Sequence, residues 1–142
     1  MPQENVEIVR RNYRFFQSAW ERVKAGEEPF KDLDPAGLYQ SDVVIQEIAE
    51  YPDADRYRGY AGMARWLRGW AEIYRELEIT PREFIAGGDH VVVPTHQRFL
   101  SNNGVEQEQF ITHVFTVRDG RIAFATGYRD KADALKAAGL GE

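Results

Sequence analysis

The sequence contains no cysteine and no long apolar run. Because none of its 142 residues is Cys, a disulfide scaffold, a cysteine nucleophile and a thiolate metal site are all excluded. No stretch approaches the roughly 20 apolar residues of a membrane span. The first five residues also lack the basic and apolar regions of a signal peptide. We therefore expect a cytoplasmic protein with no membrane partner.

Positive charge is in the minority. The 18 Lys and Arg residues are outnumbered by 23 Asp and Glu, which gives a formal net charge of −5 at pH 7. The 14 arginines are spread along the chain and form no basic stretch. Because nucleic-acid binding needs a basic face to neutralise phosphates, we expect no nucleic-acid partner.

Aromatic residues are abundant for so short a chain. Three Trp, seven Tyr and eight Phe make up 13% of the sequence. So many rings are typical of a thick core or an aromatic-lined pocket. The length is that of one domain, so we treat residues 1–142 as a single unit.

Two segments have the apolar periodicity of long helices. From about Asn5, the predicted N-cap, to Lys24, apolar residues recur at spacings of three and four. A second helix is predicted from about Tyr60 to Glu76. Its apolar face consists of Met63, Trp66, Trp70, Ile73 and Leu77. The bulk of both faces indicates that the helices cover something concave.

The other segments predict mostly strands. One strand is expected at 43–48, and three more at 91–100, 105–118 and 121–128. Residues 50–58 are expected to form a loop, and 78–86 an edge strand at best. Asp130 is expected to cap a short C-terminal helix that ends at Gly139. This order predicts an α+β domain with helices on one face of a curved, mostly antiparallel sheet.

Several strings resemble one family in their order and spacing. They are Glu4–Arg11 with the aromatic run 13–16, Tyr57-Arg58-Gly59 leading into Gly62 and Trp66, Gly88–Val93, and His113–Ile122. Together they resemble the SnoaL-like (polyketide-cyclase-like) branch of the nuclear transport factor 2-like superfamily. The resemblance implies a cone-shaped fold, a cavity between the sheet and the two long helices, and homodimers formed through the outer sheet face. The superfamily hosts isomerases, dehydratases, epoxide hydrolases, cyclases and non-catalytic binding domains.

The hairpin in the last third predicts which side chains share a face. If Leu100 opposes Val105, then His96 pairs with Gln109 and Val92 with His113. A one-residue slip would exchange these partners. The predicted pairs place two histidines, Arg98 and glutamines beside Phe115, which is typical of a small-molecule site. The opposite face, which includes Phe99, Thr95, Val93 and Phe110, would then form the dimer surface.

His113 and Glu47 are the predicted catalytic residues. A neutral imidazole can take up and release a proton near pH 7. The resemblance places His113 where related enzymes often carry an Asp, so the chain departs from that pattern. A carboxylate among aromatic rings suits acid or base work, because desolvation favours its neutral form. The alternatives are a core histidine with a satisfied hydrogen bond, and a Glu paired with an Arg at the rim. Glu50 is a substitute for Glu47.

Other side chains are predicted to line the cavity and bind substrate. The hydroxyls of Tyr13 and Tyr128 could polarise a carbonyl, and Gln109 could orient the imidazole of His96 or bind substrate. Tyr51 is expected to close the mouth of the cavity. The predicted substrate-binding residues are Tyr13, Phe16, Tyr51, Trp66, Trp70, His96, Gln109, Phe115 and Tyr128.

Three functions remain open at this point. The first is an enzyme that performs acid–base chemistry, without a cofactor, on a small apolar molecule. The second is a binding module of the same shape, and the third is a dimeric interaction domain whose own rings fill the cavity. The spacing of His96 and His113 matches no zinc motif, and no glycine-rich phosphate loop is present. We therefore expect no metal and no cofactor.

Overall fold

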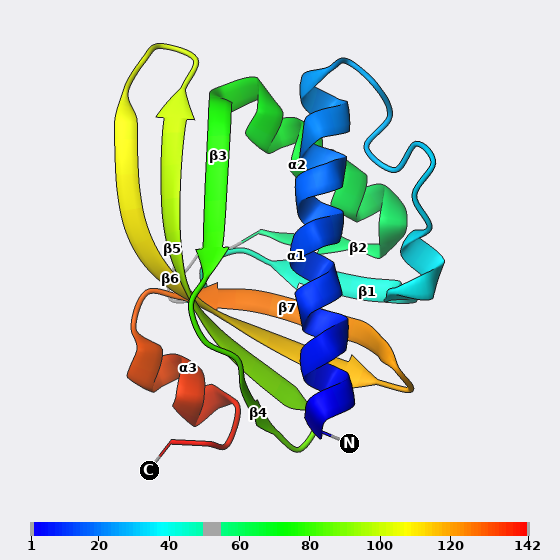
Figure 1. The fold of residues 1–142 in the computed structure, drawn as a ribbon, viewed down its shortest axis with the longest axis vertical. Helices are drawn as coiled ribbons and strands as arrows, with labels where there is room; N and C mark the ends of the chain where they lie inside the picture. The colour runs from blue at the N-terminus through cyan, green and yellow to red at the C-terminus, as the bar shows by residue number, and fades with distance from the viewer. Residues whose placement is uncertain (1, 50–54, 142) are drawn as a thin grey trace.

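The computed structural model describes residues 2–49 and 55–141 (Figure 1). In this part of the chain, three helices and a short 3-10 turn accompany seven strands. The helical elements are α1 (Pro2–Lys24), η1 (Pro35–Gly37), α2 (Gly59–Ile73) and α3 (Lys131–Ala137). The strands are β1 (Tyr39–Gln46), β2 (Arg56–Arg58), β3 (Tyr74–Pro81), β4 (Ile85–Gly87), β5 (His90–Ser101), β6 (Glu106–Arg118) and β7 (Arg121–Tyr128).

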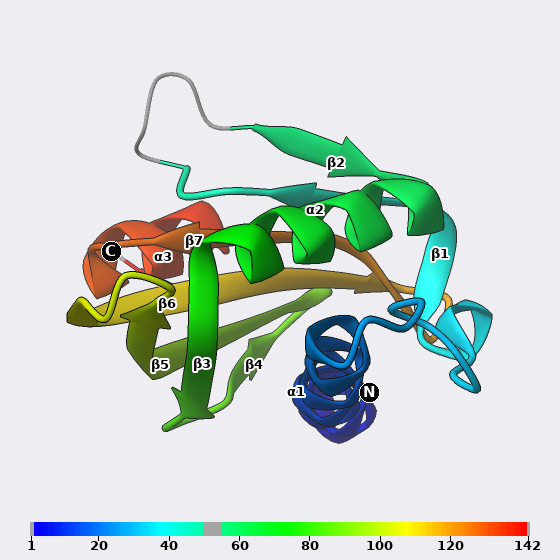
Figure 2. The same cartoon turned by 90° about the horizontal axis from the view of Figure 1, so that it is seen from above.

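All seven strands belong to one sheet. Its order is β2-β1-β7-β6-β5-β3, and β4 pairs with β5 outside this path. Every described pairing is antiparallel except that of β1 with β7. Figure 2 shows that the sheet curves, with α1 inside the curve and α3 against its far side. The predicted α+β class and mostly antiparallel sheet are confirmed.

Two layers of helices cover opposite faces of the sheet. On the inner face, α1 and α2 bury a core that includes Val9, Val43, Val93 and Ile122. On the outer face, α3 packs its alanines against Val92 and Val114. Because side chains alternate along a strand, neighbouring residues of β5 contribute to different cores.

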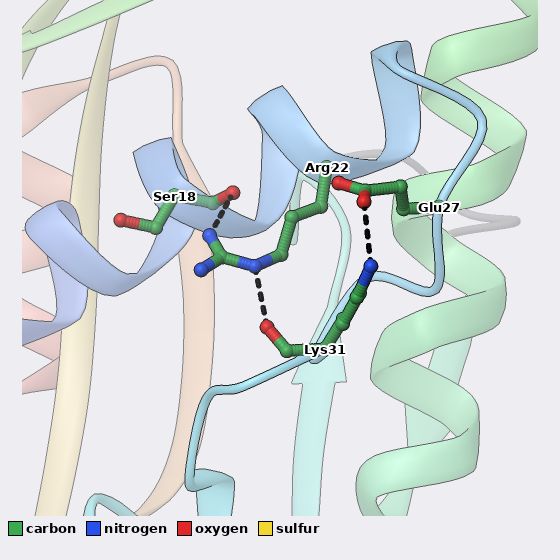
Figure 3. Close-up of polar contacts among 4 residues, drawn as sticks. All are labelled: Ser18, Arg22, Glu27 and Lys31. Carbon is green, nitrogen blue, oxygen red and sulfur yellow. Dashed lines mark hydrogen bonds and ion pairs between the residues drawn. The ribbon is translucent and has the colours of Figure 1, made fainter.

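Polar contacts hold the segment after α1 against that helix (Figure 3). The guanidinium of Arg22 donates from Nη1 to the carbonyl oxygen of Ser18 at 2.9 Å, and from Nε to that of Lys31. The amino group of Lys31 pairs with the carboxylate of Glu27, with 2.9 Å between nitrogen and oxygen. Nearby, Phe30 packs on Phe15 of α1 with ring centroids 5.4 Å apart. These contacts direct the chain from the end of α1 back towards the sheet.

The predicted ends of the long helices need correction. Helix α1 begins at Pro2 instead of Asn5, which is consistent with the preference of proline for a first helical turn. Helix α2 ends at Ile73 because Tyr74 is already extended, with φ −111° and ψ 136°. From Tyr74 the chain forms β3, which pairs with β5, so Leu77 lies on a strand instead of the helix. Tertiary strand pairing here overrides the helical periodicity.

The predicted hairpin register is wrong by one residue. Leu100 pairs with Glu106 instead of Val105, and Val93, not Val92, lies opposite His113. The amide of Ser101 donates to the carbonyl oxygen of Val105 at 2.9 Å, so the loop between them has three residues. Gly104, the last of these three, has a φ of +85°. This is the left-handed glycine expected in a three-residue hairpin loop, and the prediction had assumed a four-residue loop.

We expect Asp130→Ala to destabilise the protein by about 1 kcal/mol. The predicted cap is present: the Asp130 carboxylate accepts from the amides of Ala132 at 2.8 Å and Asp133 at 3.4 Å. Alanine leaves these amides of α3 without that acceptor. The measurement is urea unfolding, and Asp130→Asn, which keeps an acceptor, is the control. Equal losses in both variants would contradict a capping role.

Candidate functional site

A cavity of about 150 Å³ lies between the inner face of the sheet and the helices α1 and α2. An apolar cavity of that volume accommodates a molecule the size of benzene. Most of its wall is hydrophobic. Five rings that the sequence predicted for substrate binding contribute to it: Tyr13, Phe16, Trp66, Trp70 and Phe115. The structure therefore brings these rings together, and a role in binding substrate stays a prediction.

Tyr13 and His113 form the main polar contact of the cavity wall. The Tyr13 hydroxyl on α1 lies 2.7 Å from Nδ1 of His113 on β6. The two rings also stack, with centroids 5.8 Å apart. Phe115 packs edge-on against both rings. Residues that are 100 positions apart in sequence are thus held in one fixed pair.

Gln97 is a cavity residue that the sequence analysis missed. Its Nε2 lies 3.3 Å from Nε2 of His113 and 3.1 Å from Oγ1 of Thr95. Gln109, which was predicted, donates to Oε1 of Gln97 at 3.2 Å. The wrong register had placed Thr95 on the outer face and left Gln97 without a role. The left-handed glycine of the hairpin loop is the sequence signal that could have corrected this.

Glu47 also lines the cavity, one residue beyond the end of β1. Its backbone amide donates to the carbonyl oxygen of Asp55 at 3.0 Å. Its side-chain Oε2 accepts from the indole nitrogen of Trp70 at 3.3 Å. In the described part of the chain, no residue donates to Oε1. One carboxylate oxygen is therefore anchored, and the other has no donor among the described residues.

Two of the described site predictions, His96 and Tyr128, are not brought to the cavity. His96 lies on the outer face, where Nε2 is 2.9 Å from a carboxylate oxygen of Glu108 and the ring stacks on Phe110. Tyr128 also lies outside the cavity and packs beneath α3 with Val92 and Val114. Both corrections follow from strand alternation, since each residue shares parity with the outer face. Tyr51, like the substitute Glu50, falls outside the described residues.

Burial changes the proton affinity of the Tyr13–His113 pair. It lowers the pKa of the His113 imidazole from 6.5 to about 4, because the charged form loses its hydration. It also holds the pKa of the Tyr13 phenol well above 10, with a smaller contribution from nearby Tyr39. At neutral pH both groups are therefore uncharged.

The described residues contain no group of three or more His, Asp or Glu side chains placed to hold a metal ion. Over residues 2–49 and 55–141, no helix is long and apolar enough to cross a membrane.

Comparison with known proteins gives a consistent assignment of fold. The family model described as the SnoaL-like domain matches residues 13–125. No curated protein matches the chain in sequence. Many solved structures do match, and an NTF2-like protein from Burkholderia xenovorans LB400 is one of them. It is 25% identical with a TM-score of 0.65, over 96% of this chain and 97% of its own.

Two further matches have names that refer to enzymes. A putative SnoaL-like polyketide cyclase from Jannaschia sp. CCS1 is 16% identical, with a TM-score of 0.68 over 96% of this chain and 92% of its own. An LEH-like epoxide hydrolase from M. tuberculosis is 21% identical, with a TM-score of 0.63 over 99% of this chain and 92% of its own. At these identities the likeness concerns the fold alone.

We expect His113 to make the protein less stable in acid. Its folded pKa of about 4 lies below the ordinary 6.5, so the unfolded chain binds the proton more readily. The stability contributed by a neutral His113 is complete above pH 6.5 and is lost as pH falls towards 4. At about 1.4 kcal/mol per pKa unit, the loss is about 3 kcal/mol.

The measurement is the free energy of unfolding by urea between pH 4 and 7, compared with His113→Gln. Other groups that titrate remain in both proteins, so the difference between the two curves isolates His113. Parallel curves over this range would contradict a burial cost on the protonated imidazole.

Proposed function

Because the chain belongs to the SnoaL-like family, we propose that it binds a small, mostly apolar, uncharged molecule in its cavity and transfers protons on it without a cofactor. The observation that carries this proposal is the cavity, in which an apolar wall surrounds a carboxylate, Glu47, and a buried hydroxyl, Tyr13. Isomerisation, dehydration, cyclisation and epoxide hydration all require a base and a donor in a water-poor pocket.

In this proposal Glu47 is the base. Its Oε2 is anchored by the indole of Trp70 at 3.3 Å, which leaves Oε1 to approach the substrate. The backbone is fixed from both sides, because Thr126 donates to the Glu47 carbonyl oxygen at 3.3 Å and the Glu47 amide donates to Asp55. A carboxylate held in this way can present one oxygen to a substrate proton, as a general base must.

His113 takes a different role from the one that the sequence suggested. Both of its ring nitrogens lie within hydrogen-bond distance of protein groups, Tyr13 at 2.7 Å and Gln97 at 3.3 Å. A base needs a nitrogen lone pair directed at the substrate. Each ring nitrogen of His113 instead faces a protein group. We therefore assign proton abstraction to Glu47 and the positioning of Tyr13 to His113.

For a ketone, the proposed reaction is the removal of a proton next to the carbonyl, followed by its return. Glu47 removes a proton from the carbon next to the carbonyl. The electron pair of the broken C–H bond forms the C=C bond of the enolate, and the π pair of the carbonyl moves onto its oxygen. The Tyr13 hydroxyl donates a hydrogen bond to that oxygen as its negative charge develops. Glu47 then returns a proton to the enolate. Delivery to a different carbon completes an isomerisation, and delivery to the same carbon after the carboxyl proton has exchanged with solvent completes a hydrogen exchange.

We expect Glu47→Gln to abolish most proton exchange on a ketone. The probe is cyclohexanone in D₂O, and the measurement is the loss of its α-proton NMR signals. The wild-type protein accelerates this loss, and removal of the base lowers the catalysed rate about 100-fold or more. The control is Glu76→Gln, which makes the same charge change at an exposed position of β3.

A binding module without chemistry predicts a different result. Cyclohexanone would then shift the NMR signals of cavity residues, while wild-type and Glu47→Gln proteins would exchange its protons at the same rate. That outcome would overturn the enzymatic proposal and retain the ligand-binding one.

We also propose that two copies associate through the outer sheet face beyond α3. This surface consists of His96, Arg98, Glu108 and Phe110 on β5 and β6. Phe110 is 59% exposed there, and its ring stacks on that of His96. A two-fold pair would bury this ring against the same surface of the partner.

We expect Phe110→Glu to weaken this dimer about tenfold or more, as for a central apolar residue of an interface. The measurement is sedimentation equilibrium over a range of protein concentrations. Ile73→Glu, at the end of α2 with 58% exposure, is the control with the same change in polarity. A wild-type protein that stays monomeric at every concentration would overturn the proposed pair.

A further inference from the structure

A row of polar side chains leads from the sheet backbone to Tyr13. It begins at Thr95, whose Oγ1 donates to the carbonyl oxygen of Ile111 at 2.6 Å. Gln97 follows, with its Nε2 at 3.1 Å from the same Oγ1. His113 and the Tyr13 hydroxyl complete the row. The first two members are almost wholly buried, at 2% and 3% exposed, so their hydrogen bonds are not exchanged with water.

Counting protons along this row fixes the direction of each bond. A threonine hydroxyl has a single proton, and Thr95 uses it on the carbonyl oxygen of Ile111. Its oxygen can therefore only accept from Gln97, so the amide nitrogen of Gln97, not its oxygen, faces Thr95. This orientation also agrees with the contact of Gln109, which donates to Oε1 on the other side of the Gln97 amide.

The same count extends to His113. The Gln97 amide nitrogen has two protons and no lone pair for accepting, so its contact with Nε2 of His113 makes Nε2 the acceptor. A neutral imidazole has one proton, which must then be on Nδ1. Nδ1 donates it to the Tyr13 oxygen at 2.7 Å. The hydroxyl proton of Tyr13 is not used in this bond.

We infer that Thr95 and Gln97 are positioning residues, which act through the tautomer of His113 to keep the Tyr13 hydroxyl proton free for an oxygen acceptor on the ligand. The inference rests on the proposed function only in giving that proton to a ligand. The chemistry that fits is an uncharged molecule with a carbonyl, ether or epoxide oxygen. Trp66, another residue of the cavity wall, has an indole nitrogen that is buried without a hydrogen-bond partner in the described chain.

Burial keeps the row in the state that this count assumes. The lowered pKa of His113, about 4, leaves the imidazole with one proton at neutral pH. The raised pKa of Tyr13 keeps its hydroxyl protonated, so the group stays a donor. Without these shifts the ring could protonate at both nitrogens, and the bond from Gln97 would be broken.

The test is the tautomer of His113, read from ring nitrogen shifts in protein labelled with ¹⁵N-histidine at neutral pH. His113→Gln identifies the signals. In the wild type we expect the proton on Nδ1 and a bare Nε2. Gln97→Met removes the donor to Nε2, and Thr95→Val lets the Gln97 amide turn. In both variants we expect the His113 proton to move towards Nε2, the tautomer that unconstrained imidazoles favour. Thr95→Ser keeps the hydroxyl and restores the wild-type pattern.

Ligand binding gives the second readout, with cyclohexanone as the oxygen acceptor and toluene as the apolar control. We expect Gln97→Met and Thr95→Val to weaken cyclohexanone binding about three- to tenfold, the factor of one neutral hydrogen bond. Toluene binding and Thr95→Ser should be unaffected. Lost packing alone would weaken both probes equally and would not move the ring proton.

The outcomes separate this inference from the proposed function. A wild-type His113 with its proton on Nε2 overturns the inference, whatever the exchange rate of cyclohexanone. A wild-type protein that binds toluene but not cyclohexanone overturns the assignment of the Tyr13 proton to a ligand. If the tautomer and the binding results hold while Glu47→Gln leaves exchange unchanged, the inference stands and the enzymatic proposal fails.

Discussion

The register of β5 against β6 is the constraint on which the site depends. Antiparallel pairing places Val93 opposite His113 and Gln97 opposite Gln109, and strand alternation then directs all four side chains to the inner face. A slip by one residue would turn the polar groups outwards and the outer residues into the cavity. The hairpin loop sets this register, since Gly104 adopts a left-handed conformation that three-residue loops require.

The row of polar side chains from Thr95 to Tyr13 is costly to bury, but its hydrogen bonds favour one structure once all of them are formed. Hydroxyl, amide and imidazole groups removed from water destabilise a fold unless each finds a partner. Here every described member of the row has one, from the carbonyl oxygen of Ile111 to Tyr13. A satisfied row of this kind favours one arrangement of donors and acceptors over all others. Such preorganisation is what a catalytic hydrogen bond donor requires.

The two faces of the sheet divide the protein into parts with different chemistry. The inner face, closed by α1 and α2, carries Tyr13, Glu47 and the cavity. The outer face is closed by α3 only near Val92 and Val114, and it leaves Phe110 in solvent. Similar folds carry different names among solved proteins, including a putative polyketide cyclase and an epoxide hydrolase. The function of this chain therefore depends on the particular groups that line its cavity.

The sequence by itself determined the fold class and the two long helices, because apolar periodicity and turn residues are local signals. The family was indicated by the resemblance of several strings in their order and spacing, and the family model confirms it. It also identified Tyr13, Glu47, Gln109 and His113 as residues that line the cavity. Only the tertiary structure decided that α2 stops at Ile73, where pairing of β3 with β5 replaces the helix. The inner position of Gln97 and the outer position of His96 were likewise decided by pairing between strands. A single residue in the hairpin loop sets that register. The pattern of residues along each strand is the same whether the predicted or the observed register is formed.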